Sequence, residues 1–162
     1  MASQKDLNLL SSGKTLWNTW RQEYADVQAL EPDLHEADLH GADLHGVDLH
    51  GADLTEANLQ GANLREADLR EADLRNANLR HADLSDANLQ KARLRWADLR
   101  DARLCRSNLK LADLSKADLR GADLDGAIIS KAIFDEARMS RIDPNGADPD
   151  TFDRRERTEV RV

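Results

Sequence analysis

The sequence contains a single cysteine, Cys105, so it can form no disulfide within the chain and offers too few thiolates for a zinc site. Aromatic residues make up only 4% of the chain, too few to build an ordinary core. No apolar run is long enough to span a membrane, and the first thirty residues lack the basic start and apolar segment of a secretory signal. We therefore expect a cytoplasmic protein that is not embedded in a membrane.

Basic charge is also scarce: the formal net charge is −8, and no segment is a strongly basic arm of the kind that binds nucleic acid. The charge is nevertheless unevenly distributed. Residues 32–64 carry seven acids and no lysine or arginine, whereas residues 65–110 carry eleven basic residues against eight acids. This pattern makes nucleic acid a poor candidate partner.

What the sequence does contain is a five-residue repeat without a single insertion. Every fifth residue from Leu34 to Leu124 is a leucine, nineteen in all, and Ile129, Phe134 and Met139 continue the series to twenty-two units. Of the twenty-one positions two residues earlier, from 37 to 137, nineteen are alanine. A repeat this regular is typical of a solenoid, in which each unit contacts only its neighbours.

A period of five fits neither a helix nor a straight strand. On an α-helix the leucines would spiral around the axis, and on a straight strand successive leucines would point to opposite faces. The chain must therefore turn once in each unit. The alanine and the leucine, two residues apart, then point inward together, and the remaining residues face outward.

The repeated phrase, alanine, aspartate or asparagine, leucine and two variable residues, resembles that of the bacterial pentapeptide-repeat family over 110 of 162 positions. The resemblance implies an all-β fold, a right-handed quadrilateral β-helix with four units in each coil and about 5.5 coils. It divides the chain into an N-terminal segment (1–31), the β-helix (32–141) and a polar tail (142–162). Core positions would include Leu34, Leu54, Leu74, Leu94, Leu114 and Phe134.

The ends of the array suggest a cap and a tail. Leu16, Trp17, Trp20, Tyr24 and Val27 recur at helical spacing, which predicts an amphipathic helix over residues 14–29. We expect this helix to cover the first coil, although its tryptophans could instead face a partner. The polar composition after Met139 predicts a flexible tail. Because that tail offers no convincing helix, a monomer is favoured over a dimer joined through the last coils.

Two candidate chemical sites are disfavoured by this geometry. The histidines at 35, 40, 45 and 50 would fall on four different sides of one coil, so they cannot bind one metal ion together. Asp33 and Asp53 lie one coil apart in a column of stacked aspartates, and a calcium ion between them is a more speculative alternative to hydrogen bonds and ion pairs along that column.

Cys105 should project outward, with no histidine or acid placed to activate it. We predict no catalytic residue, no cofactor and no metal.

If twenty residues close a coil, outward residues twenty apart form columns. Two columns place an arginine, Arg93 or Arg103, between aspartates, which predicts ion pairs. The surface with most features of a partner site contains an arginine column, two arginines on the adjacent side and two apolar residues at corners. Its members are Arg80, Arg100, Arg120, Arg75, Arg95, Trp96 and Leu111. Asp98 and Asp118 lie beside Arg100 and Arg120 on the same face, which favours the alternative of a solvated face whose charges cancel locally.

The resulting functional hypothesis is a non-catalytic interaction or scaffold module that binds an unidentified protein. An alternative comes from relatives that mimic DNA and bind DNA gyrase or another DNA-binding protein. Such mimicry needs a continuous acidic face, which the basic residues between 65 and 110 interrupt. An enzyme is disfavoured because a leucine-filled interior leaves no cavity for a substrate.

Overall fold

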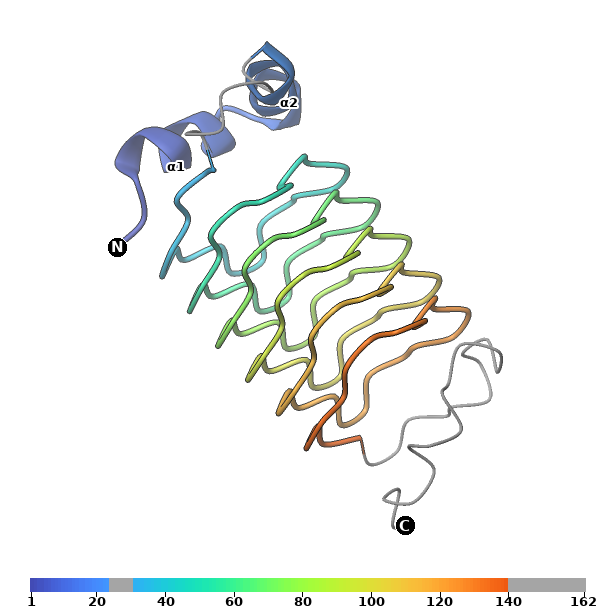
Figure 1. Cartoon of the computed structure of the whole chain (residues 1–162). Coiled ribbons are helices and arrows are strands. Elements are labelled where there is room, and N and C mark those ends of the chain that lie inside the picture. The colour runs from blue at the N-terminus through green and yellow to red at the C-terminus, as the bar shows by residue number, and fades with distance from the viewer. Residues whose placement is uncertain (24–30, 140–162) are drawn as a thin grey trace.

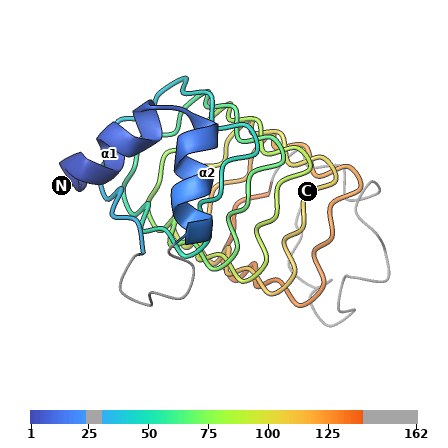
Figure 2. The ribbon, with the colours of Figure 1, turned by 90° about the horizontal axis from the view of Figure 1, so that it is seen from above.

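The computed structural model describes residues 1–23 and 31–139 of the chain. Two short helices, α1 (Gln4–Ser11) and α2 (Lys14–Glu23), precede a stack of coils. Figures 1 and 2 show both helices at the N-terminal end of this stack. The architecture is the right-handed quadrilateral β-helix with an N-terminal helical cap that the repeat predicts.

Parallel bridges between residues twenty positions apart join the coils. Eighteen such bridges run from the pair Asp33 and Asp53 to the pair Asp118 and Arg138. The Leu34 N–H, for example, donates to the Asp53 carbonyl at 2.8 Å, and the Asp53 N–H donates to the Pro32 carbonyl at 2.9 Å. Because the spacing is twenty at every bridge, four five-residue units close one coil.

We name the four sides of the β-helix after the residue that precedes leucine in the first coil. Side A begins at Asp33, side B at Asp38, side C at Asp43 and side D at Asp48. Later units on a side lie multiples of twenty residues further along the chain. On each side the residues immediately before and after leucine face outward, and the next residue forms the corner.

Every corner is a tight turn closed by one hydrogen bond. In the first unit the Ala37 N–H donates to the Leu34 carbonyl at 3.0 Å, and Glu36 has a φ of 59°. A positive φ at the third residue is the signature of a type II turn. All twenty-one corner residues from 36 to 136 have a positive φ, and six of them are glycine. None is β-branched, because a branched side chain tolerates this backbone poorly.

Most of the leucines follow an aspartate or asparagine, and this residue has a structural role that the sequence analysis did not identify. Its side-chain oxygen accepts a hydrogen bond from the backbone N–H two residues later, as Asp33 does from His35 at 3.2 Å and Asn63 from Arg65 at 3.3 Å. Short polar side chains commonly stabilise turns in this way. These two residue types are therefore selected by the turn itself and not only by exposure.

Leucine and alanine fill the interior of the coils. Leu34, Leu54, Leu74, Leu94 and Leu114 are completely buried on side A. Phe134, the next residue of this series, is only partly buried, because among the described residues no further coil stacks beneath it. The core is thus a continuous column of side chains along the axis.

The cap hydrogen-bonds to the exposed backbone edge of the first coil. On side A the Ser3 N–H donates to the Asp33 carbonyl at 2.9 Å, and Asp6 accepts from the Asp33 N–H at 3.0 Å. On side D Trp17 Nε1 donates to the Asp48 carbonyl at 2.7 Å. These contacts occupy the edge groups that a preceding coil would otherwise pair.

The helical segment differs in part from the prediction. Helix α2 begins at Lys14 as expected and is described as far as Glu23, so the predicted continuation to residue 29 lies outside the described residues. Helix α1 was not predicted, because eight residues are too few to show a helical period. Neither described helix is long and apolar enough to cross a membrane.

The tryptophans of α2 belong to the cap. Trp17 is completely buried, and Trp20 packs partly buried with its ring 5.3 Å from that of Trp17. Leu16, in contrast, is 57% exposed and does not share the buried face. The alternative in which Trp17 contacts a partner is therefore wrong.

We predict that Leu79→Ala lowers the free energy of unfolding by about 2–5 kcal/mol, because Leu79 is completely buried and a cavity would remain. The matched control is Leu111→Ala, since Leu111 is 40% exposed at a corner and should cost less than about 0.5 kcal/mol. Urea unfolding followed by circular dichroism measures both. Equal losses for the two variants would contradict the assignment of the core.

We also predict that Ser107→Ala stabilises the protein by about 1–3 kcal/mol. Ser107 occupies an alanine position, is completely buried, and its hydroxyl has no hydrogen-bond partner among the described residues. The reciprocal control is Ala87→Ser, one coil earlier in the same column, which should destabilise the protein. A lower melting temperature for Ser107→Ala would show that the hydroxyl has a partner after all.

Candidate functional site

The seven surface residues identified from the sequence lie on two sides and two corners, and not on one surface. Trp96 forms the corner between sides A and B, and Leu111 forms the corner between sides D and A. The arginines occupy positions after leucine: Arg80, Arg100 and Arg120 on side B, and Arg75 and Arg95 on side A. Side B therefore holds the longest arginine column.

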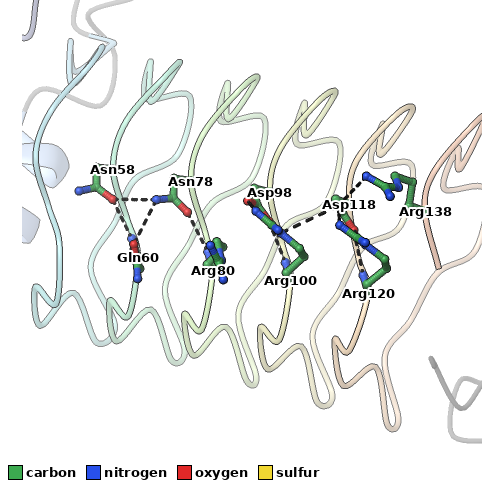
Figure 3. Close-up of polar contacts among 9 residues, drawn as sticks. All are labelled: Asn58, Gln60, Asn78, Arg80, Asp98, Arg100, Asp118, Arg120 and Arg138. Carbon is green, nitrogen blue, oxygen red and sulfur yellow. Dashed lines mark hydrogen bonds and ion pairs between the residues drawn. The ribbon is translucent and has the colours of Figure 1, made fainter. Parts of the chain in front are cut away.

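Figure 3 shows that side B is built from two neighbouring columns. The first column contains the residues before the central leucine or, in the last unit, Met139: Asn58, Asn78, Asp98, Asp118 and Arg138. The second contains the residues after leucine: Gln60, Arg80, Arg100 and Arg120. The bridges fix the vertical order of each column. The side-chain oxygens at 78, 98 and 118 accept the backbone N–H two residues later, at 3.2–3.3 Å, which fixes how the two columns face each other.

Arg100 and Arg120 each form an ion pair with the aspartate of their own coil. Arg120 donates to Asp118 through Nε at 2.8 Å and through Nη2 at 2.6 Å. Arg100 donates to both oxygens of Asp98 in the same way, with its Nε at 2.8 Å from Oδ1. A two-point contact between guanidinium and carboxylate is the strongest form of such a pair.

The pairs extend along the column and keep the carboxylates charged. Arg138 lies 3.4 Å from Asp118, and Arg100 lies 3.9 Å from it. Hydrogen bonds from Arg120 hold the pKa of Asp118 below its usual value, against the effect of partial burial. Burial also acts to raise the pKa of Asp98, yet the hydrogen bonds and charge of Arg100, helped by Arg80, leave it lowered.

Arg80 is the exception in the column. The residue two positions before it is Asn78, which accepts the Arg80 backbone N–H at 3.3 Å but carries no charge. The Arg80 side chain makes no hydrogen bond or ion pair with the described residues, and its Nε is buried without a partner. Side B therefore contains one guanidinium that its own coil does not neutralise.

The arginines of side A also divide into paired and unpaired. Asp73 lies 2.7 Å from Arg75 and 3.5 Å from Arg93. The predicted pair between Arg103 and Asp83 on side C is likewise present, at 3.4 Å. Arg95, in contrast, is exposed and makes no ion pair with the described residues. It precedes Trp96 in the chain, so an unpaired charge lies next to an exposed indole.

The exposed apolar residues form two separate features. Trp96 is 56% exposed, and the Lys116 ammonium lies 4.8 Å from the centre of its ring, one coil below. Leu111 is 40% exposed, and Ile128 and Ile133, each 44% exposed, flank the same corner one coil further on. The sequence analysis did not group these isoleucines with Leu111.

Cys105 is more enclosed than the sequence suggests. It follows leucine on side C but is buried, and its Sγ lies 2.9 Å from Asp123 Oδ2. Burial and the adjacent carboxylate both raise the pKa of the thiol. The sequence analysis did not place Asp123 beside Cys105, but this acid disfavours the thiolate and so does not activate a nucleophile.

The described residues contain no group of three or more histidine, cysteine, aspartate or glutamate side chains arranged to bind a metal ion. The first four histidines lie on four sides, as the register requires. His35 instead contacts Thr55, the residue below it in the column, at 2.6 Å.

We predict that acid destabilises the protein below about pH 4, and that the double variant Asp98→Asn, Asp118→Asn reduces this dependence. Both carboxyls have a folded pKa below the unfolded value of about 3.9. Their contribution is therefore complete above the unfolded pKa and is lost as the pH falls through the folded pKa. Melting temperatures between about pH 2.5 and 7 test this.

The control for the acid experiment is Asp38→Asn, in the same column. Asp38 makes no ion pair with the described residues and accepts a hydrogen bond from Asn58 that an asparagine oxygen could also accept. Its substitution should leave the acid profile unchanged. A profile that flattens equally in both variants would show that the ion pairs of side B are not the cause.

Comparison with known proteins places this geometry in a family. The family model for pentapeptide repeats matches residues 33–70, 67–106 and 107–143, with eight copies. A search of curated proteins found no match. Among solved structures, a pentapeptide repeat protein from the cyanobacterium Cyanothece 51142 is 28% identical, with a TM-score of 0.57, over 76% of this chain and 96% of that one.

Two further solved structures are similar in sequence. HetL, a pentapeptide repeat protein involved in heterocyst differentiation regulation in Nostoc sp. strain PCC 7120, is 36% identical over 70% of this chain and 58% of its own, with a TM-score of 0.48. One from the Arabidopsis thaliana thylakoid lumen is 32% identical over 57% of this chain and 65% of its own, with a TM-score of 0.42. The chain belongs to the pentapeptide-repeat family.

Proposed function

We propose that the chain is a non-catalytic interaction module that binds another protein through the corner between sides A and B. The observation that carries this proposal is the exposure of Trp96, at 56% of its surface, on a backbone held by hydrogen bonds to the coils above and below. Tryptophan is enriched among the residues that dominate binding energy at protein interfaces. A fixed backbone also limits the conformational entropy lost on binding.

Charge at the same corner supports a polar contact around the indole. Arg95 is exposed and without an ion pair among the described residues, and Lys116 lies against the indole while pairing with Glu136 at 3.6 Å. Arginine is the charged residue commonly enriched in interface centres. A partner with an apolar residue bordered by acids would complement this corner.

The interior argues against an enzyme. The central leucines from Leu49 to Leu119 are completely buried, so side chains fill the axis where a substrate cavity would otherwise lie. The raised pKa of Cys105 also leaves the only thiol protonated at neutral pH. A cytoplasmic location is part of the same proposal, supported by the near absence of cysteine.

DNA mimicry is less well supported than protein binding through this corner. Arg93 and Arg103 interrupt the aspartate columns of sides A and C, and side B carries four arginines against two aspartates from residue 78 onward. A mimic of a duplex needs regularly spaced negative charge along one face. The described surface alternates in sign instead.

We predict that the double variant Arg95→Ala, Trp96→Ala loses the protein partner, by roughly tenfold or more in recovered amount, because it removes the proposed centre of the interface. The measurement is affinity capture from cells that express the chain, with quantitative mass spectrometry. Gln90→Ala, Lys110→Ala on side D is the matched control. If all three proteins recover the same partners in equal amounts, this corner is not the binding surface.

A further inference from the structure

Three consecutive coils repeat the same side-B unit with one change. The units are Asn78-Leu79-Arg80, Asp98-Leu99-Arg100 and Asp118-Leu119-Arg120. In the second and third units the aspartate binds its own arginine at two points. The first unit has the arginine without the carboxylate. Figure 3 shows the three units in order along the column.

Asn78 carries no charge and makes no hydrogen bond with the Arg80 guanidinium. Its single oxygen accepts the Arg80 backbone N–H, and its amide nitrogen donates toward the preceding coil, to Asn58 at 3.2 Å and Gln60 at 3.4 Å. Every polar atom of the Asn78 amide therefore already has a partner. The amide group is held with its NH₂ turned away from Arg80.

The nearest carboxylate in the next coil is also occupied. Arg80 helps to lower the pKa of Asp98, so the positive charge of Arg80 acts on the Asp98 carboxylate. Both oxygens of Asp98, however, accept hydrogen bonds from Arg100. Arg80 Nε is buried without an acceptor, whereas its terminal nitrogens are not buried in this way and make no hydrogen bond with the described residues, so they remain available to an anion.

We propose that Arg80 binds a carboxylate supplied by the partner, an aspartate or glutamate side chain of the docked protein. This inference rests on the proposed function, since it specifies the chemistry of that partner. The bound carboxylate would accept two parallel hydrogen bonds from the terminal nitrogens of the Arg80 guanidinium, because Nε itself is buried. Arg80 would thus select an acidic residue at one defined height along the β-helix.

The surroundings favour a single carboxylate over a nucleic-acid backbone. The ladder offers one unpaired guanidinium, because Arg100 and Arg120 are each bound to a carboxylate of their own. A polyanion would also have to approach Asp98 and Asp118, which stay charged, and a chain with a net charge of −8. One negative side chain matches the one unpaired guanidinium, whereas a string of phosphates does not.

The most direct test is Asn78→Asp, which supplies the carboxylate from within the coil. The variant should fold, because aspartate is the usual residue at this position of the repeat. We expect the introduced carboxylate to pair with Arg80 and weaken anion binding about tenfold or more, as for hydrogen bonds to charged groups. Asn88→Asp on side D adds the same charge before a glutamine and is the matched control.

Binding is measured on the full chain by NMR of the arginine Nε–Hε groups. The probes are a six-residue peptide of alternating glycine and glutamate, inorganic phosphate, and a single-stranded oligothymidine. The Arg80 signal is assigned by its loss in Arg80→Lys. We expect the acidic peptide to shift the Arg80 signal saturably, while the Arg120 signal moves little, in the native chain and in Asn88→Asp but not in Asn78→Asp.

Several results would overturn the inference. These are parallel shifts of all arginine signals, an unchanged response in Asn78→Asp, or a stronger response of Arg80 to phosphate or oligothymidine than to the peptide. The test uses purified protein and a simple probe. A failed partner capture with a positive Arg80 response would thus refute only the proposed corner, and the reverse result would refute only the carboxylate site.

Discussion

The stacking of backbone hydrogen bonds at a spacing of twenty residues is the constraint on which the rest of the structure depends. Each unit turns at a corner residue with a positive φ, and in most units a side-chain oxygen of the residue before leucine also accepts a backbone N–H of the turn. The narrow interior then admits only leucine-sized and alanine-sized side chains. Turn chemistry and core packing thus select the same five-residue phrase, which is why the repeat continues without an insertion.

Because the register is uniform, side chains twenty positions apart share a column, so aspartates in neighbouring coils lie close together and repel each other. Arginines relieve this repulsion in two ways. Arg93 and Arg103 each lie within reach of an aspartate one coil earlier, whereas Arg100 and Arg120 fold back onto the aspartate of their own unit. Each exposed pair contributes little on its own, but together they relieve repulsion that stacked carboxylates would otherwise create. The Arg80 guanidinium, which makes no ion pair with the described residues, therefore differs from the other arginines of its column.

Periodicity alone predicts one turn in each unit, and the resemblance to the pentapeptide-repeat family supplies the coil of four units that defines the columns. Three features could not be predicted from the sequence. Helix α1 is too short to show a period, and the buried position of Cys105 depends on the neighbouring side chains of side C, which spacing does not describe. The third is the contrast between Arg80 and Arg100: the sequence has asparagine before one and aspartate before the other, but it does not show that Arg100 folds back onto Asp98 or that Arg80 Nε is buried without a partner. Asparagine and aspartate both accept the backbone N–H of the turn, so either residue can occupy this position of the repeat.

That equivalence explains how such a fold can acquire specificity without altering its shape. Exchanging aspartate for asparagine before leucine preserves the turn, because either oxygen accepts the backbone N–H two residues later. The same exchange decides whether the following arginine is neutralised within its coil or left to bind an anion outside it. The backbone therefore places the arginines at fixed intervals along the axis, and a single exchange of aspartate for asparagine determines whether an arginine remains available to bind an anion. In this chain residue 78 makes Arg80 available on side B, while Trp96 forms the corner between sides A and B at the start of the next side-B unit.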